Sequence, residues 1–222
     1  MKTEKTIYVV IGGTSGIGAA LVAQLSNDGN IVHLASRQTG LDISDEQAVA
    51  QYFETIGTLD HLVITAGSYA PAGKVVDVSI SDAKAALDIK FWGSIHAAKH
   101  AARYMKPGGS ITLTTGMLSR KVIPNTYVKT ATNAALEAVT KVLARELAPI
   151  RVNAISPGLT QSSAYQYLNE ADQTALFEQA KNSLPVGKVA TTDDIATAYT
   201  LVINNSFMTG AIVDVDGGAL IS

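Results

Sequence analysis

The sequence predicts a single α/β domain, residues 1–222, built on a doubly wound parallel sheet. Apolar, β-branched segments typical of strands alternate along the chain with segments of helical periodicity. A glycine-rich turn joins the first expected strand to the first expected helix. Hydrophobic residues make up 47% of the chain and charged residues 16%, which is typical of a globular protein. Strands that alternate with helices pair in parallel, so helices should cover both faces of the sheet.

The first strand and helix form a candidate phosphate site. The segment Tyr8 to Ile11 has the character of a buried strand, and a helical segment, Ala19 to Leu25, follows it. Between them lie Gly12, Gly16 and Gly18. Glycine permits a sharp turn and close approach of a pyrophosphate, while the helix N-terminus supplies free N–H groups. This order predicts a Rossmann-like dinucleotide site, and a tight turn without a ligand is the alternative.

The end of the second expected strand, 31–35, indicates which dinucleotide binds. It lies about 20 residues beyond the glycine turn, where an acidic residue would bind the ribose of NAD. Ser36 and Arg37 stand there instead. A guanidinium and a hydroxyl would bind a 2′-phosphate through charge-assisted hydrogen bonds. We therefore expect NADP(H), the alternative being that Arg37 is a solvated loop charge.

The remaining elements continue the alternation. We expect helices at about 45–56, 81–104, 128–147 and 193–203, and strands at 61–65, 110–115, 151–155 and 211–215. The segment 159–184 is more polar, and we expect it to hold short helices and to form a variable lid over the substrate. Its apolar side chains predict a small, partly apolar ligand: Tyr165, Tyr167, Leu168 and Phe177.

Composition and charge argue against several other classes of function. A formal charge of −2 provides no basic face for nucleic acid, and no apolar run is long enough to span a bilayer. There is no cysteine, and residues 1–5 lead directly into the first strand, so we expect a cytoplasmic protein. His96 and His100 are four residues apart, but no third ligand accompanies them, so we expect no metal site.

Five motifs in order resemble those of the short-chain dehydrogenase/reductase family, over nearly the whole chain. They are Gly12-x-x-x-Gly16-Ile17-Gly18, Thr65-Ala66-Gly67, the segment Arg151 to Gly158, Leu184 to Lys188, and Val213 to Gly218. The resemblance implies an oxidoreductase that interconverts a carbonyl and an alcohol on a small molecule. It also implies a homodimer or homotetramer formed through the helices at 81–104 and 128–147.

The resemblance further implies which residues hold the cofactor, from the diphosphate and 2′-phosphate through the adenine to the nicotinamide. They are Gly12, Thr14, Ser15, Gly16, Ile17, Ser36, Arg37, Asp42, Ile43, Ala66, Gly67, Asn133, Pro157, Gly158, Leu159 and Thr160. Asp42 and Ile43 would flank the adenine, and residues 157–160 would lie at the nicotinamide end.

One departure from the family is architectural. Family members usually place a helix and most of a strand between the equivalents of Arg37 and Asp42, but only four residues separate them here. We expect one helix and an edge strand to be lost, with a strand stub near 41–43. Six full parallel strands and a more open adenine side should remain.

The second departure is chemical. The family reduces carbonyls with a Tyr, a Lys four residues later, a Ser on the preceding strand and an Asn on the long helix; a spacing of four places Tyr and Lys on one helical face. Ungapped alignment puts Lys129 at the Tyr position and Asn133 at the Lys position. It puts Gly116 at the Ser position and Lys90 at the Asn position.

Three functions stay open on these residues. In a rebuilt oxidoreductase, Lys129 donates a proton to the carbonyl oxygen, and Lys90 is the second cation that lowers its pKa. Asn133 then keeps the ribose hydrogen bonds and Thr115 orients a substrate oxygen, while Tyr127 is the alternative donor, reaching in from the loop before the helix. The other two functions are a catalytically silent NADP(H)-binding sensor or partner subunit, and a structural protein that only keeps the fold.

Overall fold

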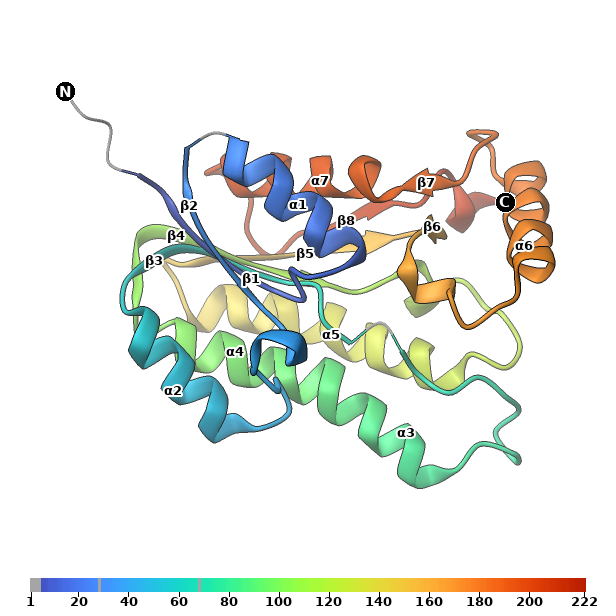
Figure 1. Cartoon of the computed structure of the whole chain (residues 1–222), viewed down its shortest axis with the longest axis horizontal. Coiled ribbons are helices and arrows are strands. Elements are labelled where there is room, and N and C mark those ends of the chain that lie inside the picture. The colour runs from blue at the N-terminus through green and yellow to red at the C-terminus, as the bar shows by residue number, and fades with distance from the viewer. Residues whose placement is uncertain (1–4, 28, 68) are drawn as a thin grey trace.

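A computed structural model describes residues 5–27, 29–67 and 69–222 and contains a six-stranded parallel sheet (Figure 1). The strand order is β2-β1-β3-β4-β5-β8. The bounds are β1 (Ile7–Ile11), β2 (Ile31–Ala35), β3 (Leu59–Ile64), β4 (Met105–Thr114), β5 (Arg151–Pro157) and β8 (Ile212–Val215). Ile11 at the end of β1 pairs with Ala35 on one side and Ile64 on the other. The order therefore reverses at β1, and a doubly wound sheet opens its ligand crevice at such a reversal.

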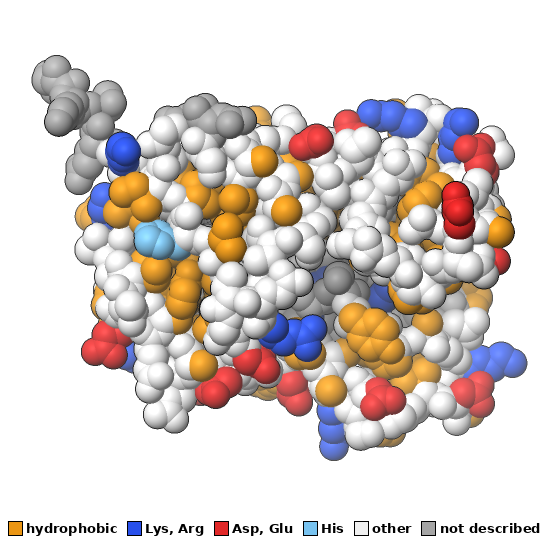
Figure 2. Space-filling view, in the orientation of Figure 1, with side chains coloured by type: hydrophobic (Ala, Val, Ile, Leu, Met, Phe, Trp, Pro, Cys, Tyr) orange, Lys and Arg blue, Asp and Glu red, His pale blue; other side chains and the backbone are white. Residues whose placement is uncertain are grey.

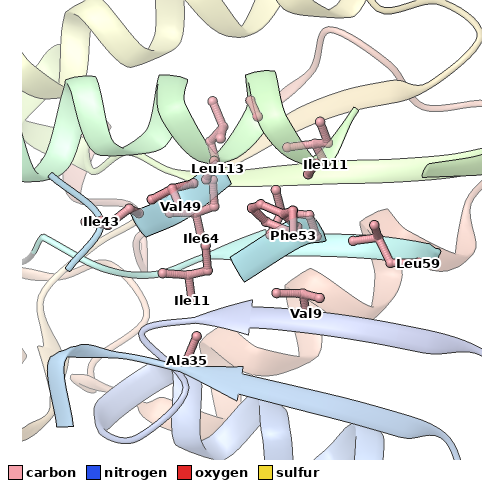
Figure 3. Packing of buried hydrophobic residues seen from close by; sticks show 14 of the residues in the cluster. Val9, Ile11, Ala35, Ile43, Val49, Phe53, Leu59, Ile64, Ile111 and Leu113 are labelled. Atoms are coloured by element: carbon pink, nitrogen blue, oxygen red, sulfur yellow. The ribbon is translucent and has the colours of Figure 1, made fainter. Parts of the chain in front are cut away.

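Helices cover both faces of this sheet, as expected. α1 (Gly16–Asn27) and α7 (Thr192–Asn204) lie on one face, and on the other lie α2 (Glu46–Ile56), α3 (Ile80–Leu87), α4 (Gly93–Ala101) and α5 (Tyr127–Glu146) (Figure 1). Side chains alternate along β1, because Tyr8 and Val10 pack toward α1 and α7 while Val9 and Ile11 pack toward α2 (Figure 3). Phe53 of α2 is completely buried there. Two apolar cores thus hold the sheet rigidly beneath its carboxyl edge.

The connection after β2 is short, and the expected loss of a helix and an edge strand is confirmed. A single turn, η1 (Arg37–Thr39), is capped by Ser36, and α2 follows directly behind its N-cap Asp45. β2 is therefore the sheet edge, with Ile31 and Leu34 each 40% exposed, and hydrophobic side chains show on this side of the surface (Figure 2).

The expected strand stub at 41–43 is wrong. The Leu41 N–H donates to the Ser36 carbonyl within the turn, 2.9 Å away, and therefore cannot pair with a strand. The side chains of Leu41 and Ile43 are buried in the core formed with α2, so this segment closes the core in place of the missing elements.

The long helix expected at 81–104 is interrupted. α3 ends at Leu87, a π-helical turn, η2 (Asp88–Trp92), follows, and α4 continues from Gly93. Such turns distort a helix locally and are frequent at functional sites; this one carries Lys90. The next strand begins at Met105 rather than 110, because Leu59 pairs with Met105 and a register irregularity absorbs the Pro107–Gly109 segment.

The segment 159–184 stands apart from the main sheet. It holds β6 (Thr160–Gln161), η4 (Ser163–Tyr165) and α6 (Glu170–Ser183), and β6 pairs in parallel with β7 (Ala190–Thr191). No residue of α6 is buried, so this helix is not part of the core. None of the helices described is long and apolar enough to cross a bilayer.

Candidate functional site

Two cavities meet above the carboxyl ends of the central strands. The smaller has a volume of about 340 Å³ and extends from the glycine turn to η1. The larger, about 570 Å³, lies over the ends of β3, β4 and β5. Their linings share Ile17, Thr65, Ala66, Gly67, Tyr69 and Ser162 to Ala164, so the two spaces adjoin. Together they form an elongated cleft at the reversal of strand order.

The glycine turn fits a dinucleotide. Gly12 has φ +91°, and a Cβ there would lie 2.5 Å from Thr65 Oγ1. A Cβ on Gly18 would lie 2.2 Å from the Gly12 carbonyl oxygen, so both glycines allow α1 to pack against β1 and β3. At Gly16 the nearest atoms to a Cβ, in Ser162 and Ser163, are 3.7 Å away, which leaves this residue facing the cavity. These are the roles that a pyrophosphate-binding turn requires.

All sixteen residues expected to hold the cofactor line one of the two cavities. The smaller cavity is lined by Gly12, Thr14, Ser15, Gly16, Ile17, Ser36, Arg37, Asp42, Ile43, Ala66 and Gly67. Asn133, Pro157, Gly158, Leu159 and Thr160 line the larger one. Hydrogen bonds from Ser44 hold the pKa of the Asp42 carboxyl below its usual range, and the charge of Arg37 contributes less. The carboxylate is thereby tethered to its own loop.

Four candidate catalytic residues line the larger cavity together. Lys90 comes from η2, Thr115 directly follows β4, and Lys129 and Asn133 come from successive turns of α5. The Lys90 ammonium donates to Asn133 Oδ1 at 2.7 Å and to the Thr115 carbonyl at 3.1 Å. The Asn133 amide in turn donates to the Gly116 carbonyl at 3.4 Å. Asn133 therefore links η2 to the segment that follows β4.

Gly116 and Asn133 are sterically coupled. A Cβ at Gly116 would lie 2.9 Å from Asn133 Nδ2, so a larger residue there requires the amide to move. The Thr115 hydroxyl donates to the Ile155 carbonyl at 3.3 Å. Thr115 therefore borders the cavity while its hydroxyl is hydrogen-bonded to β5.

Both lysines have lowered pKa values, and burial is the main cause. Burial lowers the pKa of Lys90 to about 8, and the positive charge of Lys129 is the second cause. The pKa of Lys129 is also lowered, by burial. The two ammonium groups repel one another, since the charge of Lys129 contributes to the lowered pKa of Lys90. This repulsion is mutual, so a contribution of Lys90 to the lowered pKa of Lys129 stays a prediction, while burial is the larger cause.

Tyr127 lies elsewhere. It is the first residue of α5, lines neither cavity, and packs in a small cluster with Ala83, Ala86 and Val128. Its hydroxyl is buried without a hydrogen-bond partner within the described chain. Tyr127 thus belongs to α5 and not to a loop before it, and its phenol lies in a small core and not in the cleft.

The segment 159–184 closes one side of the cleft. Tyr165 and Tyr167 line the larger cavity, whereas Leu168 and Phe177 do not. The ring of Tyr165 meets that of Phe177 edge to face at 5.7 Å, and burial raises the pKa of Tyr165 to about 12. Sequence reasoning missed Ser162 to Ala164, which border both cavities. Two serines and an alanine form no pattern that could have indicated this.

The expected absence of a metal site concerned His96 and His100. His96 Nδ1 lies 3.2 Å from the Ile43 carbonyl, and His100 Nε2 lies 3.1 Å from a Glu46 carboxylate oxygen. Both imidazoles are thus engaged with the segment from β2 to α2. Within the described residues, no group of three or more potential ligands could hold a metal ion.

The buried ammonium of Lys90 predicts a measurable dependence of stability on pH. Its folded-state pKa of about 8 lies below the ordinary 10.5, so the unfolded chain binds more protons between these values. The free energy of unfolding is therefore lowered below pH 8, and it rises by at most about 3 kcal/mol as the pH increases toward 10.5. Urea unfolding of the protein and of Lys90→Met at pH 7 and pH 10 should show this gain in the former only. Parallel changes in both proteins would contradict it.

Comparison with known proteins identifies relatives over the full length of the chain. A family model described as Enoyl-(Acyl carrier protein) reductase matches residues 11–219. Short-chain dehydrogenase/reductase ATR9 of Stachybotrys chlorohalonatus is 34% identical, and the match covers 96% of each chain. The 3alpha-hydroxysteroid dehydrogenase of Mediterraneibacter gnavus is 30% identical, over 99% of this chain and 98% of its own. A crystal structure of a small-chain dehydrogenase in complex with NADPH is similar with a TM-score of 0.97 and 66% identity, covering 99% of this chain and all of that one.

Proposed function

The chain belongs to the short-chain dehydrogenase/reductase family, and from this we propose that it uses NADP(H) to interconvert a carbonyl and an alcohol on a small, partly apolar substrate. The observation that carries the proposal is the adjoining of two cavities, one around the glycine turn and one containing Lys129. A catalytically silent NADP(H) binder is the second candidate, since none of the four family catalytic residue types stands at its expected position in the sequence.

The cofactor would be held along the cleft by residues already in place. The N-terminus of α1, with Gly16 and Ile17, would bind the diphosphate, and Ser36 with Arg37 would bind the 2′-phosphate. The similar structure with NADPH supports this choice. When bound, NADPH supplies the hydride for a carbonyl carbon.

The residues of the larger cavity would then manage the substrate oxygen. The Lys129 ammonium donates a proton to it as negative charge develops, and the lowered pKa brings this lysine nearer to the range where general acids work well. To orient the same oxygen, the Thr115 hydroxyl would have to turn away from the Ile155 carbonyl. The bond between Lys90 and Asn133 holds η2 and α5 in position beside the cavity. Tyr165, in the lid of residues 159–184, limits access of water.

Cofactor choice gives the first test of this function. NADPH should bind at least tenfold more tightly than NADH, a difference of about 1.4 kcal/mol, because Arg37 and Ser36 can pair with the 2′-phosphate. Arg37→Asp should shrink or reverse the difference. Fluorescence titration with both cofactors measures it, and Arg103→Asp, on a residue that lines neither cavity, is the charge-matched control. Equal affinities in the unmutated protein would defeat the choice of NADP(H).

Assembly and location are proposed on the family and the sequence. A homodimer or homotetramer would use α4 and α5. Val142 on α5 and Trp92, directly before α4, are half exposed. Light scattering at micromolar concentration would show a monomer if this is wrong. A cytoplasmic location and a single functional domain over residues 1–222 remain predictions.

A further inference from the structure

We propose that the larger cavity takes an oxo acid, a carbonyl compound whose carboxylate pairs with Lys90 while its carbonyl oxygen faces Lys129. This inference rests on the proposed oxidoreductase function and specifies its substrate class.

The cavity carries two cations and no anion. Of the described residues that line it, Lys90 and Lys129 are the ionised ones at neutral pH, and no Asp or Glu is among them. Within the described chain, the Lys129 ammonium has no hydrogen bond and no ion pair. Other lysines have carboxylates within 3.5 Å: Lys99, Lys106, Lys181 and Lys188. Two partly buried ammonium groups without a counterion are costly, so an anionic ligand would bind them favourably.

Lys90 has one N–H left for such a ligand. An ammonium group carries three donors, and Asn133 Oδ1 and the Thr115 carbonyl accept two of them. Both bonds fix the position of the ammonium at the cavity wall. A carboxylate oxygen could therefore accept the third N–H without displacing any bond within the protein.

The phosphates of the cofactor do not explain these charges. Phosphate groups belong at the glycine turn, which lines the smaller cavity with Gly12, Thr14 and Ser15. Neither Lys90 nor Lys129 lines that cavity. The first turn of α5, which contains Lys129, also holds no acidic residue, so the positive end of the helix adds to the same potential.

The rest of the lining suits the remainder of an oxo acid. Small and apolar side chains face the cavity beyond the lysines: Ala70, Ala72, Ala86, Met117, Leu118 and Tyr165. A volume of about 570 Å³ lies within the usual range for small-molecule sites. An apolar or aromatic group next to the oxo acid function would therefore fit.

Binding of matched probes to the NADPH-saturated protein tests the anion site without any turnover. By calorimetry, benzoate should bind at least tenfold more tightly than benzamide, which has the same shape without the charge. Lys90→Gln should weaken benzoate binding about tenfold, because the charge-assisted hydrogen bond to the carboxylate is lost, and should weaken benzamide binding much less. Lys129→Gln should weaken benzoate binding by a smaller factor, because a nearby positive charge is lost. Lys141→Gln, on the exposed face of the same helix, is the matched control and should change neither. Equal binding of benzoate and benzamide, or no binding of either, would overturn the proposal.

Reduction of matched ketones separates this inference from the proposed function. Benzoylformate should be reduced with a kcat/KM at least tenfold above that of its methyl ester, although the ester is intrinsically more reactive toward hydride. Faster reduction of the ester would overturn the oxo acid and leave the oxidoreductase intact. Tight benzoate binding without reduction of either ketone would support the anion site and count against the oxidoreductase.

Discussion

Replacing Lys129 by methionine is expected to lower NADPH-dependent reduction by roughly 100-fold to 10,000-fold, the usual contribution of a general acid. Methionine keeps most of the side-chain volume and removes the proton donor. Affinity for NADPH should stay within about twofold, because Lys129 does not line the cavity that contains the glycine turn and Arg37. Activated ketones, diketones and quinones are suitable substrates for the rate measurement, and fluorescence titration measures the cofactor.

The pH dependence of the unmutated protein should identify the same group. A general acid must be protonated, so turnover should fall as pH rises through the pKa of Lys129, and burial places that fall below the ordinary lysine value of 10.5. Because the repulsion between the two ammonium groups is mutual, Lys90→Met should move this decline to higher pH. A decline that stays in place in Lys90→Met would show that burial alone lowers the pKa of Lys129.

A matched control is available on the same helix. Tyr127→Phe removes only a hydroxyl that lies in a small core and away from the cleft, so its turnover should match that of the unmutated protein. If Lys129→Met retains full turnover while Tyr127→Phe loses it, the phenol is the donor and Lys129 is not. If the unmutated protein itself reduces none of these substrates, the silent binder becomes the stronger candidate.

Most of the fold followed from the sequence because apolar periodicity reports burial directly. The six strands and their flanking helices lie within a few residues of the expected bounds, and the shortened connection after Arg37 could be counted from the chain. The start of β4 could not be predicted, because Pro107 to Gly109 has the composition of a turn. Only pairing with β3 makes this segment part of the strand. The π-helical turn at Lys90 likewise has no sequence signal and depends on how α3 and α4 pack.

The residues of the candidate site could be predicted from the sequence, but the interactions between them could not. The glycine turn and the alignment of α5 indicated the positions that line the two cavities. The bond between Lys90 and Asn133 joins elements 43 residues apart, and its formation depends on side-chain geometry that a sequence does not specify. The lowered pKa values of the two lysines have the same origin, since they depend on how much water each ammonium loses.

That bond determines how the family pattern can be restored. The variant Gly116→Ser, Lys129→Tyr, Asn133→Lys recreates three of the four catalytic types, but it removes the amide that accepts from Lys90. The new lysine would place a second ammonium beside Lys90, where no carboxylate lines the cavity within the described chain. An unsatisfied buried donor costs about 1–3 kcal/mol, and a close like-charge contact costs several more. We therefore expect the triple variant to lose roughly 2–5 kcal/mol of stability and to be inactive.

Adding Lys90→Asn as a fourth change should reverse both effects. It removes the repulsion between the two lysines and supplies the fourth family residue type. The serine introduced at position 116 does not clash with the Asn133 amide, 2.9 Å from the added Cβ, because that amide has been replaced. Urea unfolding should show the quadruple variant at least about 2 kcal/mol more stable than the triple variant, with Lys90→Asn alone as the control for that substitution. Gain of NADPH-dependent reduction in the quadruple variant, from a parent with none, would identify the natural protein as a silent binder whose scaffold still supports the family chemistry. Equal stability of the triple and quadruple variants would show that the ammonium of Lys90 tolerates a neighbouring charge, and the coupling through Asn133 would then be wrong.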